Sequence, residues 1–463
     1  MPTPQLDPRD PETRIARLLD DGKFEFLLPR TDCGMVAVTG DIKGNKVIVF
    51  ASDPTIKSGA LGVEGSKVIV SAYKVAMGAQ VPIIGIWHSG GARLSDGVAS
   101  LDAFGEVFQS MISASGRIPQ LSLVLGPTAG GGAYGPALTD IVVLSPEGRI
   151  FVTGPEVVKS VTGEDIDMAL LGGPEAHRKN SGLAHIIAPT EQEAIDDVRD
   201  LTALFANHGV MNPDVADIDL SVFVPQSQVR TYEVHPLVDA ILDKETEHIE
   251  LLSMWAPNMT TIIGRLGGAT VGVLANNPAH IAGILDAAAG EKAARFVRTC
   301  DAFGIPLIVI ADVQGFLPGA GQEWEGAVRR GAKLLHAFGE AVIPRVTLIT
   351  RRAYGGAYVA MNSKALGATR VFAWPDAEVS VMGAVAAIRV LHRRILADLP
   401  AEQRESMELE LAAEHEKISG GVARAVEIGA VDEIIYPAHT RSALAKIIAS
   451  TPHRRGAHGN IPL

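Results

Sequence analysis

The feature that most constrains the fold of this chain is an internal repeat. The segment AQVPIIGIWHSGGARL is an apolar run that leads into a glycine turn, and FGIPLIVIADVQGFLPG has the same form, with Pro82 and Pro306 separated by 224 positions. The motif GGAYGPA from Gly131 matches GGAYVAM from Gly355 at the same offset. A fixed period is the sequence signature of a duplicated architecture. The chain is therefore predicted to contain two copies of one fold.

Later blocks extend the repeat. LSPEGRIFVTGP and AWPDAEVSVMGA align with Gly154 on Gly383 at an offset of 229, which requires a five-residue insertion. GLAHIIAP and GAVDEIIYP close the two halves in the same way. We expect the copies to join near DLSVFVPQSQVRTYEVHP, giving domains over 1–228 and 229–463. A chain of 463 residues agrees with this division, because one core rarely serves so many residues.

Each half predicts the same order of elements. A strand pair (GDIKGNKVIVFASD; GRLGGATVGVLANNP) precedes a helix (SKVIVSAYKVAMGA; EKAARFVRTCDAFG) whose apolar residues lie three and four apart. A buried strand, a glycine turn, a helix, a second buried strand and a GGAY turn follow, with a helix starting near Ala133 in the first half. Strands that alternate with helices indicate the α/β class.

Composition excludes several classes of protein. The net charge of −12 argues against a general nucleic-acid surface. Short basic clusters at Arg329–Arg330, Arg351–Arg352, Arg393–Arg394 and 453–455 are expected to be solvated or at interfaces, with an anionic ligand as the alternative. The longest apolar runs are strand-sized, so no membrane association is expected. Two distant cysteines and no visible secretory signal predict a cytoplasmic location.

The glycine turns are the candidate chemical features. Gly130, Gly131 and Gly132 separate the strand LSLVLG from a helix, and helix N-termini expose N–H groups that can hold a developing oxyanion. Close packing of helix and strand is the alternative interpretation. Met382-Gly383-Ala384 begins another helix without any reactive side chain, and its counterpart Gly154 is followed by a proline, which removes one N–H donor.

Other catalytic motifs are not apparent in the sequence. We find no phosphate-binding P-loop, no complete dinucleotide fingerprint and no G-x-S-x-G elbow. The histidines lack metal-ligand spacing, so no protein-bound metal is expected. His88 and Asp312 occupy nearly equivalent places in the two halves and are expected to orient loops. With no convincing carboxylate pair or Ser-His-Asp set, the chemistry is predicted to depend on amides and on what the ligands supply.

The motifs SGGARL, GPTAGGGAYGPALTD, VTGPEVVKSVTGED, GFLPG, RRAYGGAYVAM and WPDAEVSVMGA together resemble the carboxyltransferase (β) subunit of biotin-dependent acyl-CoA carboxylases. The resemblance covers nearly the whole chain and is nearest to the actinobacterial acetyl-/propionyl-CoA carboxylase type. It implies two tandem crotonase-type ββα-superhelix domains, the first binding acyl-CoA and the second carboxybiotin. It also implies a hexamer built from dimers, with sites between the first domain of one subunit and the second domain of its dimer partner.

The resemblance assigns roles to individual residues. Gly130 and Gly131 would hold the thioester enolate, and Gly383 and Ala384 would hold the ureido oxygen of biotin. Other implied or expected contacts are the acyl-CoA contacts Lys57, Arg93, Gly132, Ala133, Tyr134, Val385 and Ala386, with Lys57 and Arg93 meeting the CoA phosphates, and the biotin contacts Gly355 and Gly356. The cofactor itself would act as the base, so the lack of an acid/base pair fits this mechanism.

The expected reaction transfers the carboxyl group of carboxybiotin to acetyl-CoA, giving malonyl-CoA for fatty-acid or mycolic-acid synthesis, with some activity on propionyl-CoA. The implied partner is an α subunit that carries biotin and uses ATP and Mg. Two related alternatives stay open: a propionyl-CoA carboxylase β subunit and a biotin-dependent decarboxylase subunit with a membrane partner. A crotonase-type hydratase, which needs a positioned glutamate pair, and a noncatalytic assembly subunit are the more distant alternatives.

Overall fold

The computed structural model describes residues 7–227, 230–419 and 421–462, and these divide into two compact units. One unit runs to His208 and includes Ile249–Trp255 and Ala457–Pro462, and the other comprises Gly209–His248 and Ala256–Gly456. The domain boundary expected between residues 228 and 229 lies outside the described residues and stays a prediction.

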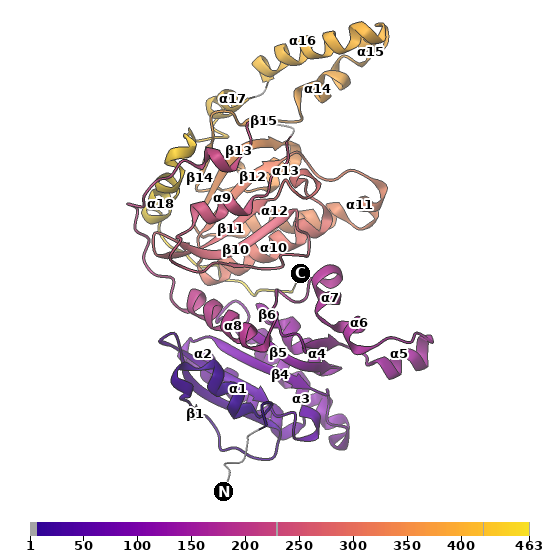
Figure 1. Cartoon of the computed structure of the whole chain (residues 1–463), viewed down its shortest axis with the longest axis vertical. Coiled ribbons are helices and arrows are strands. Elements are labelled where there is room, and N and C mark those ends of the chain that lie inside the picture. The colour runs from indigo at the N-terminus through magenta and orange to yellow at the C-terminus, as the bar shows by residue number, and fades with distance from the viewer. Residues whose placement is uncertain (1–6, 228–229, 420, 463) are drawn as a thin grey trace. The chain divides into compact units, whose positions relative to one another are not determined.

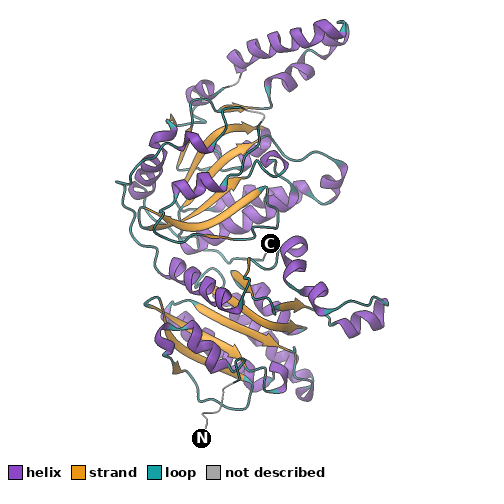
Figure 2. Ribbon diagram, in the orientation of Figure 1, coloured by secondary structure: helices purple, strands orange, loops and turns teal. Residues whose placement is uncertain are grey.

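The first unit is built on a mostly parallel sheet (Figure 2). An antiparallel meander at one edge leads into parallel strands, in the order β1-β2-β3-β4-β5-β6-β8, and β7 pairs with the end of β5. The strands are β1 (Glu25–Phe26), β2 (Met35–Ile42), β3 (Asn45–Ser52), β4 (Ile83–Ser89), β5 (Gln120–Ala129), β6 (Ile141–Leu144), β7 (Arg149–Phe151) and β8 (Ile186–Ile187). Their near-continuous burial explains the apolar runs in the sequence.

Helices cover this sheet (Figure 1). The helices are α1 (Pro11–Leu18), α2 (Val63–Ala79), α3 (Val98–Ala114), α4 (Gly131–Leu138), α5 (Pro155–Thr162), α6 (Met168–Gly172), α7 (Pro174–Ala176) and α8 (Glu191–Ala206). Buried side chains of α2, α3 and the strands, among them Phe50, Tyr73, Trp87 and Phe104, form one core. This core fixes the strand ends from which the glycine turns depart.

The second unit repeats the same topology. Its strands follow the order β16-β14-β13-β12-β11-β10, and β15 pairs with β13 as β7 pairs with β5. They are β10 (Met259–Leu266), β11 (Ala269–Asn276), β12 (Leu307–Val313), β13 (Arg345–Tyr354), β14 (Arg370–Ala373), β15 (Glu378–Ser380) and β16 (Glu433–Ile434). A second core, with Ile308, Leu348 and Phe372 among its buried residues, lies on this sheet.

The helices of the second unit include an arm. The helices are α9 (His235–Ile241), α10 (Ala287–Phe303), α11 (Ala320–Trp324), α12 (Ala327–Glu340), α13 (Gly355–Ala360), α14 (Ala384–Leu391), α15 (Arg393–Ala397), α16 (Ala401–Ser419), α17 (Val422–Glu427) and α18 (Thr440–Ser450). Helices α14, α15 and α16 extend away from the sheet of this unit (Figure 1) around a small core that contains Ile388, Leu396 and Ala412.

The duplication extends to local backbone geometry. Strand pairing shifts register at His88 in the first unit and at Asp312 in the second. The left-handed triplet 57–59 recurs at 281–283, where Gly59 and Gly283 approach the carbonyls of His88 and Asp312 so closely that an added Cβ would lie 2.0 and 2.7 Å away. The predicted α/β class and the two copies of one fold are confirmed.

Two local expectations were wrong. Helix α4 begins at Gly131, two residues before the expected start near Ala133, because the turn after β5 places Gly131 directly in a helical conformation. Arg351 and Arg352 are not solvated: their side chains are 4 % and 9 % exposed, and both pair with the buried Asp312 at 2.8 and 3.4 Å. No helix of the described residues is able to cross a membrane.

Candidate functional site: two glycine turns

The first turn follows β5. Its strand end pairs with β7 from Pro127↔Arg149 to Ala129↔Phe151, and the chain then reverses at Gly130, where φ is 59° and ψ is −130°. Only glycine adopts this conformation readily. The N–H of Gly130 donates to the carbonyl of Phe151 at 3.1 Å, and its own carbonyl accepts from Ala133 at 3.1 Å. Gly130 thus shapes the turn and joins it to β7.

The amide of Gly131 is the unpaired donor of this turn among the described residues. It is the first residue of α4, and within the described part of the chain its N–H has no acceptor. Helix N-termini carry a partial positive charge in addition to such unpaired N–H groups. The sequence predicted that both Gly130 and Gly131 hold the enolate oxygen. In the structure Gly131 presents a free N–H donor, whereas the N–H of Gly130 is already bonded to Phe151.

Neighbouring loops support the same turn. Gly91 of the SGGARL segment lies so close to it that an added Cβ would meet the carbonyl oxygen of Ala129 at 3.0 Å. A Cβ on Gly132 would lie 3.3 Å from Ser89 Oγ, which accepts a hydrogen bond from Gly91 N–H at 3.2 Å. The two glycine segments of the first unit thus pack together at one end of its sheet.

The other predicted acyl-CoA residues have different surroundings. Tyr134 is 49 % exposed, and its ring meets Phe108 edge-on, whereas Ala133 is buried. Lys57 is exposed in the left-handed triplet. Arg93 donates to the carbonyls of Cys33 at 2.6 Å and Ala60 at 3.3 Å, so part of its guanidinium already braces the backbone.

The second unit has a related turn after β13. Its left-handed glycine is Gly355, with φ of 60°, one position later in the repeat than Gly130. An added Cβ on Gly355 would lie 3.0 Å from the carbonyl oxygen of Val381. The expected biotin contacts around Gly355 are therefore brought next to the segment that leads to Gly383; Gly356 is exposed beside them.

The segment after β15 forms the second donor site. Gly383, with φ of −56° and ψ of 140°, caps α14, and its carbonyl accepts from Ala387 N–H at 3.0 Å. Over the described residues, the N–H groups of Gly383 and Ala384 have no acceptor. Val385 is half-buried and Ala386 is exposed in the same helical turn. The expected helix start is confirmed, and it presents free amides.

Tyr354 supports this second site. Its side chain is buried, its hydroxyl donates to the carboxylate of Glu378, and its ring would lie 3.7 Å from a Cβ on Gly383. The register Tyr354↔Ser380 joins β13 to β15 immediately before the turn. The turn that carries the backbone donors is thus held by the pairing of β13 with β15 and lies next to the buried ring of Tyr354.

The first unit carries the matching turn with one donor fewer. Gly154 caps α5 with φ of −68° and ψ of 159°, close to the values of Gly383. Pro155 stands at the first helical position, where the second unit has Ala384. Because proline has no N–H, this turn cannot supply the pair of donors.

Side chains that could act as metal ligands do not gather near these turns. In residues 7–227, 230–419 and 421–462, no group of three His, Cys, Asp or Glu side chains could hold a metal ion. Sequence reasoning missed one charged group, around Arg14, His88 and Glu191, because these residues are far apart in the chain and share no motif.

Comparisons with known proteins agree with this geometry. Residues 14–458 match the family model of the carboxyl transferase domain. The chain is 57 % identical to the biotin-dependent acetyl-/propionyl-coenzyme A carboxylase beta6 subunit of Mycobacterium tuberculosis, over 99 % of this chain and 98 % of that one. It is 51 % identical to the propionyl-CoA carboxylase beta chain of Rhodococcus erythropolis, over 99 % and 97 %.

Among solved structures, the chain resembles transcarboxylase 12S, a hexamer crystallised with methylmalonyl-coenzyme A, with a TM-score of 0.90 and 35 % identity. The match covers 97 % of this chain and 91 % of that one.

Proposed function

We propose, from the premise that this chain belongs to the carboxyl transferase domain family, that it transfers a carboxyl group from carboxybiotin to the α carbon of a short acyl-CoA. The chain is a carboxyltransferase of the acetyl-/propionyl-CoA carboxylase type, and its reaction involves biotin. The proposal concerns which residues perform the transfer and on which acyl group.

The free amides of Gly383 and Ala384 carry the proposal. Among the described residues, a Cβ on Gly383 would meet only the ring of Tyr354 within 4 Å, so there is space beside this turn. Val381 and Met382, which are 78 % and 37 % exposed, give the same turn an apolar edge. A cyclic urea fits this arrangement, with its oxygen on the two amides and its apolar ring against the edge, while Gly355 and Gly356 lie beside it.

When bound, carboxybiotin supplies the carboxyl group and a nitrogen base for the α proton. The chain contributes backbone donors. The N–H of Gly131 would hold the thioester oxygen as negative charge develops on it, and Gly130 would hold Gly131 in place through the bond to Phe151. Gly132, Ala133 and Tyr134 would line the same helical turn. One such donor typically contributes about 3 to 4 kcal/mol of transition-state stabilisation.

Acetyl-CoA is the proposed preferred substrate, with activity on propionyl-CoA. The small side chains of Val385 and Ala386 are the residues that we assign to the acyl pocket, and Lys57 and Arg93 are those assigned to the CoA phosphates. One methylene changes specificity by only about 1 to 3 kcal/mol, so both acyl groups fit one pocket. Preference for propionyl-CoA is the second candidate, because a relative with 51 % identity is a propionyl-CoA carboxylase beta chain.

We also propose that the chain acts in the cytoplasm as a hexamer built from dimers; the solved relative is a hexamer. Its partner would be an α subunit that carries biotin and loads it at the expense of ATP and Mg. The proposed domain roles are acyl-CoA binding by 1–228 and carboxybiotin binding by 229–463.

The reverse half-reaction tests the function without the partner. The purified chain is incubated with malonyl-CoA or methylmalonyl-CoA and free biotin, and release of acetyl-CoA or propionyl-CoA is followed. We expect release only when biotin is present, and the ratio of the two rates measures the acyl preference. Biotin-independent hydration of an enoyl-CoA, with no biotin-dependent release, would contradict the proposal.

The forward reaction is the matching test of the partner. Labelled bicarbonate should enter acetyl-CoA or propionyl-CoA only when ATP, Mg and a biotinylated α subunit are all present. Incorporation without the biotinylated subunit would show that the assignment of the partner is wrong.

A further inference from the structure

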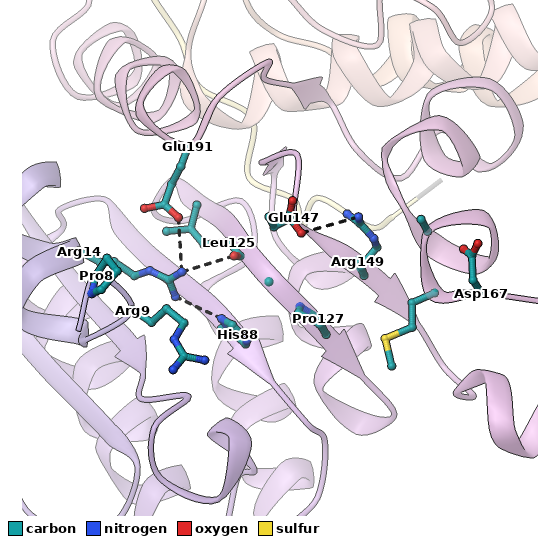
Figure 3. A pocket seen from close by; sticks show the side chains of 13 residues that line it. Pro8, Arg9, Arg14, His88, Leu125, Pro127, Glu147, Arg149, Asp167 and Glu191 are labelled. Carbon is teal, nitrogen blue, oxygen red and sulfur yellow. Dashed lines mark hydrogen bonds and ion pairs between the residues drawn. The ribbon is translucent and has the colours of Figure 1, made fainter.

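The first unit contains a cavity that is lined by none of the residues that we assign to carboxyl transfer. It has a volume of about 610 Å³, within the range of small-molecule sites, and lies beside the ends of β4 and β5 (Figure 3). Its wall combines the apolar side chains of Leu125, Pro127 and Met168 with the hydrogen-bond donors Arg14, His88 and Arg149, and it also contains the carboxylates of Glu147, Asp167 and Glu191. A wall of this composition suits a ligand with an anionic end and a hydrocarbon part.

Arg14 is a buried cation whose hydrogen-bonding capacity is not filled. Its side chain is 3 % exposed, and Nε has no hydrogen-bond partner. Its other contacts are long: 3.3 Å from Nη1 to His88 Nδ1, and 3.4 Å from Nη2 to both Leu125 O and Glu191 Oε2. Charge-assisted bonds are normally 2.7 to 2.9 Å, and Glu191 is shared with Arg17. Arg14 therefore retains donors for an oxyanion.

His88 adds a second donor to the same wall. A guanidinium only donates, so Nδ1 of His88 accepts from Arg14 and the neutral ring carries its proton on Nε2. Burial, together with the charges of Arg14 and Arg9, lowers the pKa of His88 to about 4, so the ring is neutral at pH 7. Gly126 makes room for it, because a Cβ there would lie 2.4 Å from Nδ1.

The second unit provides an internal comparison. The residue that corresponds to His88 is Asp312, and the strand pairing makes Arg351 and Arg352 the counterparts of Gly126 and Pro127. Asp312 pairs with Arg351 at 2.8 Å and with Arg352 at 3.4 Å, and Tyr232 stacks on the guanidinium of Arg351 at 4.7 Å. The second unit thus fills this position with its own ion pairs, whereas the first unit has the uncharged Gly126 and Pro127 there.

The remaining charged residues of the wall are engaged elsewhere or face solvent: Arg9 pairs with Asp7, and Glu191 pairs with Arg17. The side chain of Asp167 accepts from Leu170 N–H at 2.8 Å, and that of Glu147 is 84 % exposed. Arg149 donates to the carbonyls of Pro146 and Gly148. The buried end of the cavity is therefore left to Arg14 and His88.

We propose that this cavity binds a small organic monocarboxylate, whose carboxylate accepts hydrogen bonds from Arg14 and His88 Nε2 and whose hydrocarbon part lies against Leu125, Pro127 and Met168. The ligand would contact Pro127 and Arg149, which form the first residue pair between β5 and β7. The last pair between these strands, Ala129↔Phe151, lies next to the Gly130 turn.

Calorimetric titration of the full-length chain with sodium octanoate tests the proposal. We expect saturable binding that Arg14→Gln and His88→Phe each weaken by about tenfold or more, since each removes a hydrogen bond to a charged group. Lys67→Gln is the control for the loss of one positive charge, because Lys67 lies on α2, pairs with Glu64 and does not line the cavity. Its affinity should stay within about threefold of the wild type.

Further variants and ligands distinguish the possible results. If Arg14→Gln fails to fold, His88→Phe and Met168→Gln carry the test, and Met168→Gln should weaken octanoate but not acetate. Inorganic phosphate, which lacks a hydrocarbon part, should bind more weakly than octanoate. Absence of saturable octanoate binding, equal or tighter binding of phosphate, or octanoate binding that none of the cavity variants changes would each overturn the proposal.

Discussion

Replacing Ala384 with proline would remove one backbone donor at the proposed biotin site and almost nothing else. Proline is well tolerated at the first position of a helix, and the preceding Gly383 already has the extended ψ of 140° that proline favours in its neighbour. The first unit demonstrates the geometry, because Gly154 at ψ of 159° precedes Pro155 in the same turn. The change should therefore leave the melting temperature within a few degrees of the wild type.

The expected loss of activity is large. If Ala384 N–H holds the ureido oxygen, its removal should cost about 3 kcal/mol of transition-state stabilisation, which is about a hundredfold in kcat. Biotin-dependent release of acetyl-CoA from malonyl-CoA measures this loss, and calorimetric titration with acetyl-CoA measures binding at the other site. Acyl-CoA affinity should be unchanged, because the proposed acyl-CoA donor, Gly131, lies on the first unit and the substitution leaves the helix that carries Val385 and Ala386 intact.

The control for this substitution is Ala384→Ser, which keeps the N–H and adds one small polar atom. It should retain most of the activity. The reasoning is refuted if Ala384→Pro folds and keeps kcat within about threefold of the wild type. Equal losses from the serine and proline variants would mean that the side-chain position matters and the amide does not, and loss of acyl-CoA binding would reverse the assigned roles of the two turns.

Two further predictions concern stability. His88→Gln should make the protein more resistant to acid: the pKa of His88 lies near 4 in the folded chain and near 6.5 when unfolded, so the wild type loses up to about 3 kcal/mol as the pH falls from 6.5 to 4, and none above 6.5. Denaturant midpoints at pH 7 and 4.5 measure this, and an equal acid shift in both proteins would contradict it. Gly59→Ala should be far more damaging than Gly44→Ala in thermal unfolding. Both glycines have positive φ, which costs alanine about 1 to 2 kcal/mol, but only at Gly59 would the new Cβ collide with a backbone oxygen, at 2.0 Å, whereas nothing lies within 4 Å at Gly44. Similar melting temperatures for the two variants would show that the backbone there yields to the clash.

Much of the fold could be predicted from the sequence because the repeat tests each local interpretation twice. A strand ending near His88 gains support from the strand that ends at Asp312, and the topology of one sheet predicts that of the other. Helix α14 was predictable from its apolar spacing after Gly383. The start of α4 was not, because Gly131 and Gly132 have poor helix propensity and the turn is fixed by tertiary contacts with Phe151 and Ser89.

The functional turns were partly predictable. Paired glycines before a helix indicate backbone donors, but the sequence cannot show that Gly130 N–H is already bonded to Phe151, since that contact depends on how β7 pairs. Arg93 appeared suited to phosphate, yet it donates to two carbonyls of its own unit. The cavity was missed because Arg14 meets His88 across 74 residues and Glu191 across 177.

Pro155 also bears on the history of the chain. A duplicated gene first yields two halves with the same functional residues, and the two halves can then diverge. A proline at this position leaves the helix intact but supplies no N–H donor, so folding does not oppose this difference between the halves. A chain assembled from two first halves would therefore be expected to fold and to lack the paired amides of Gly383 and Ala384. The difference between the halves at this turn thus affects catalysis and not the stability of the fold.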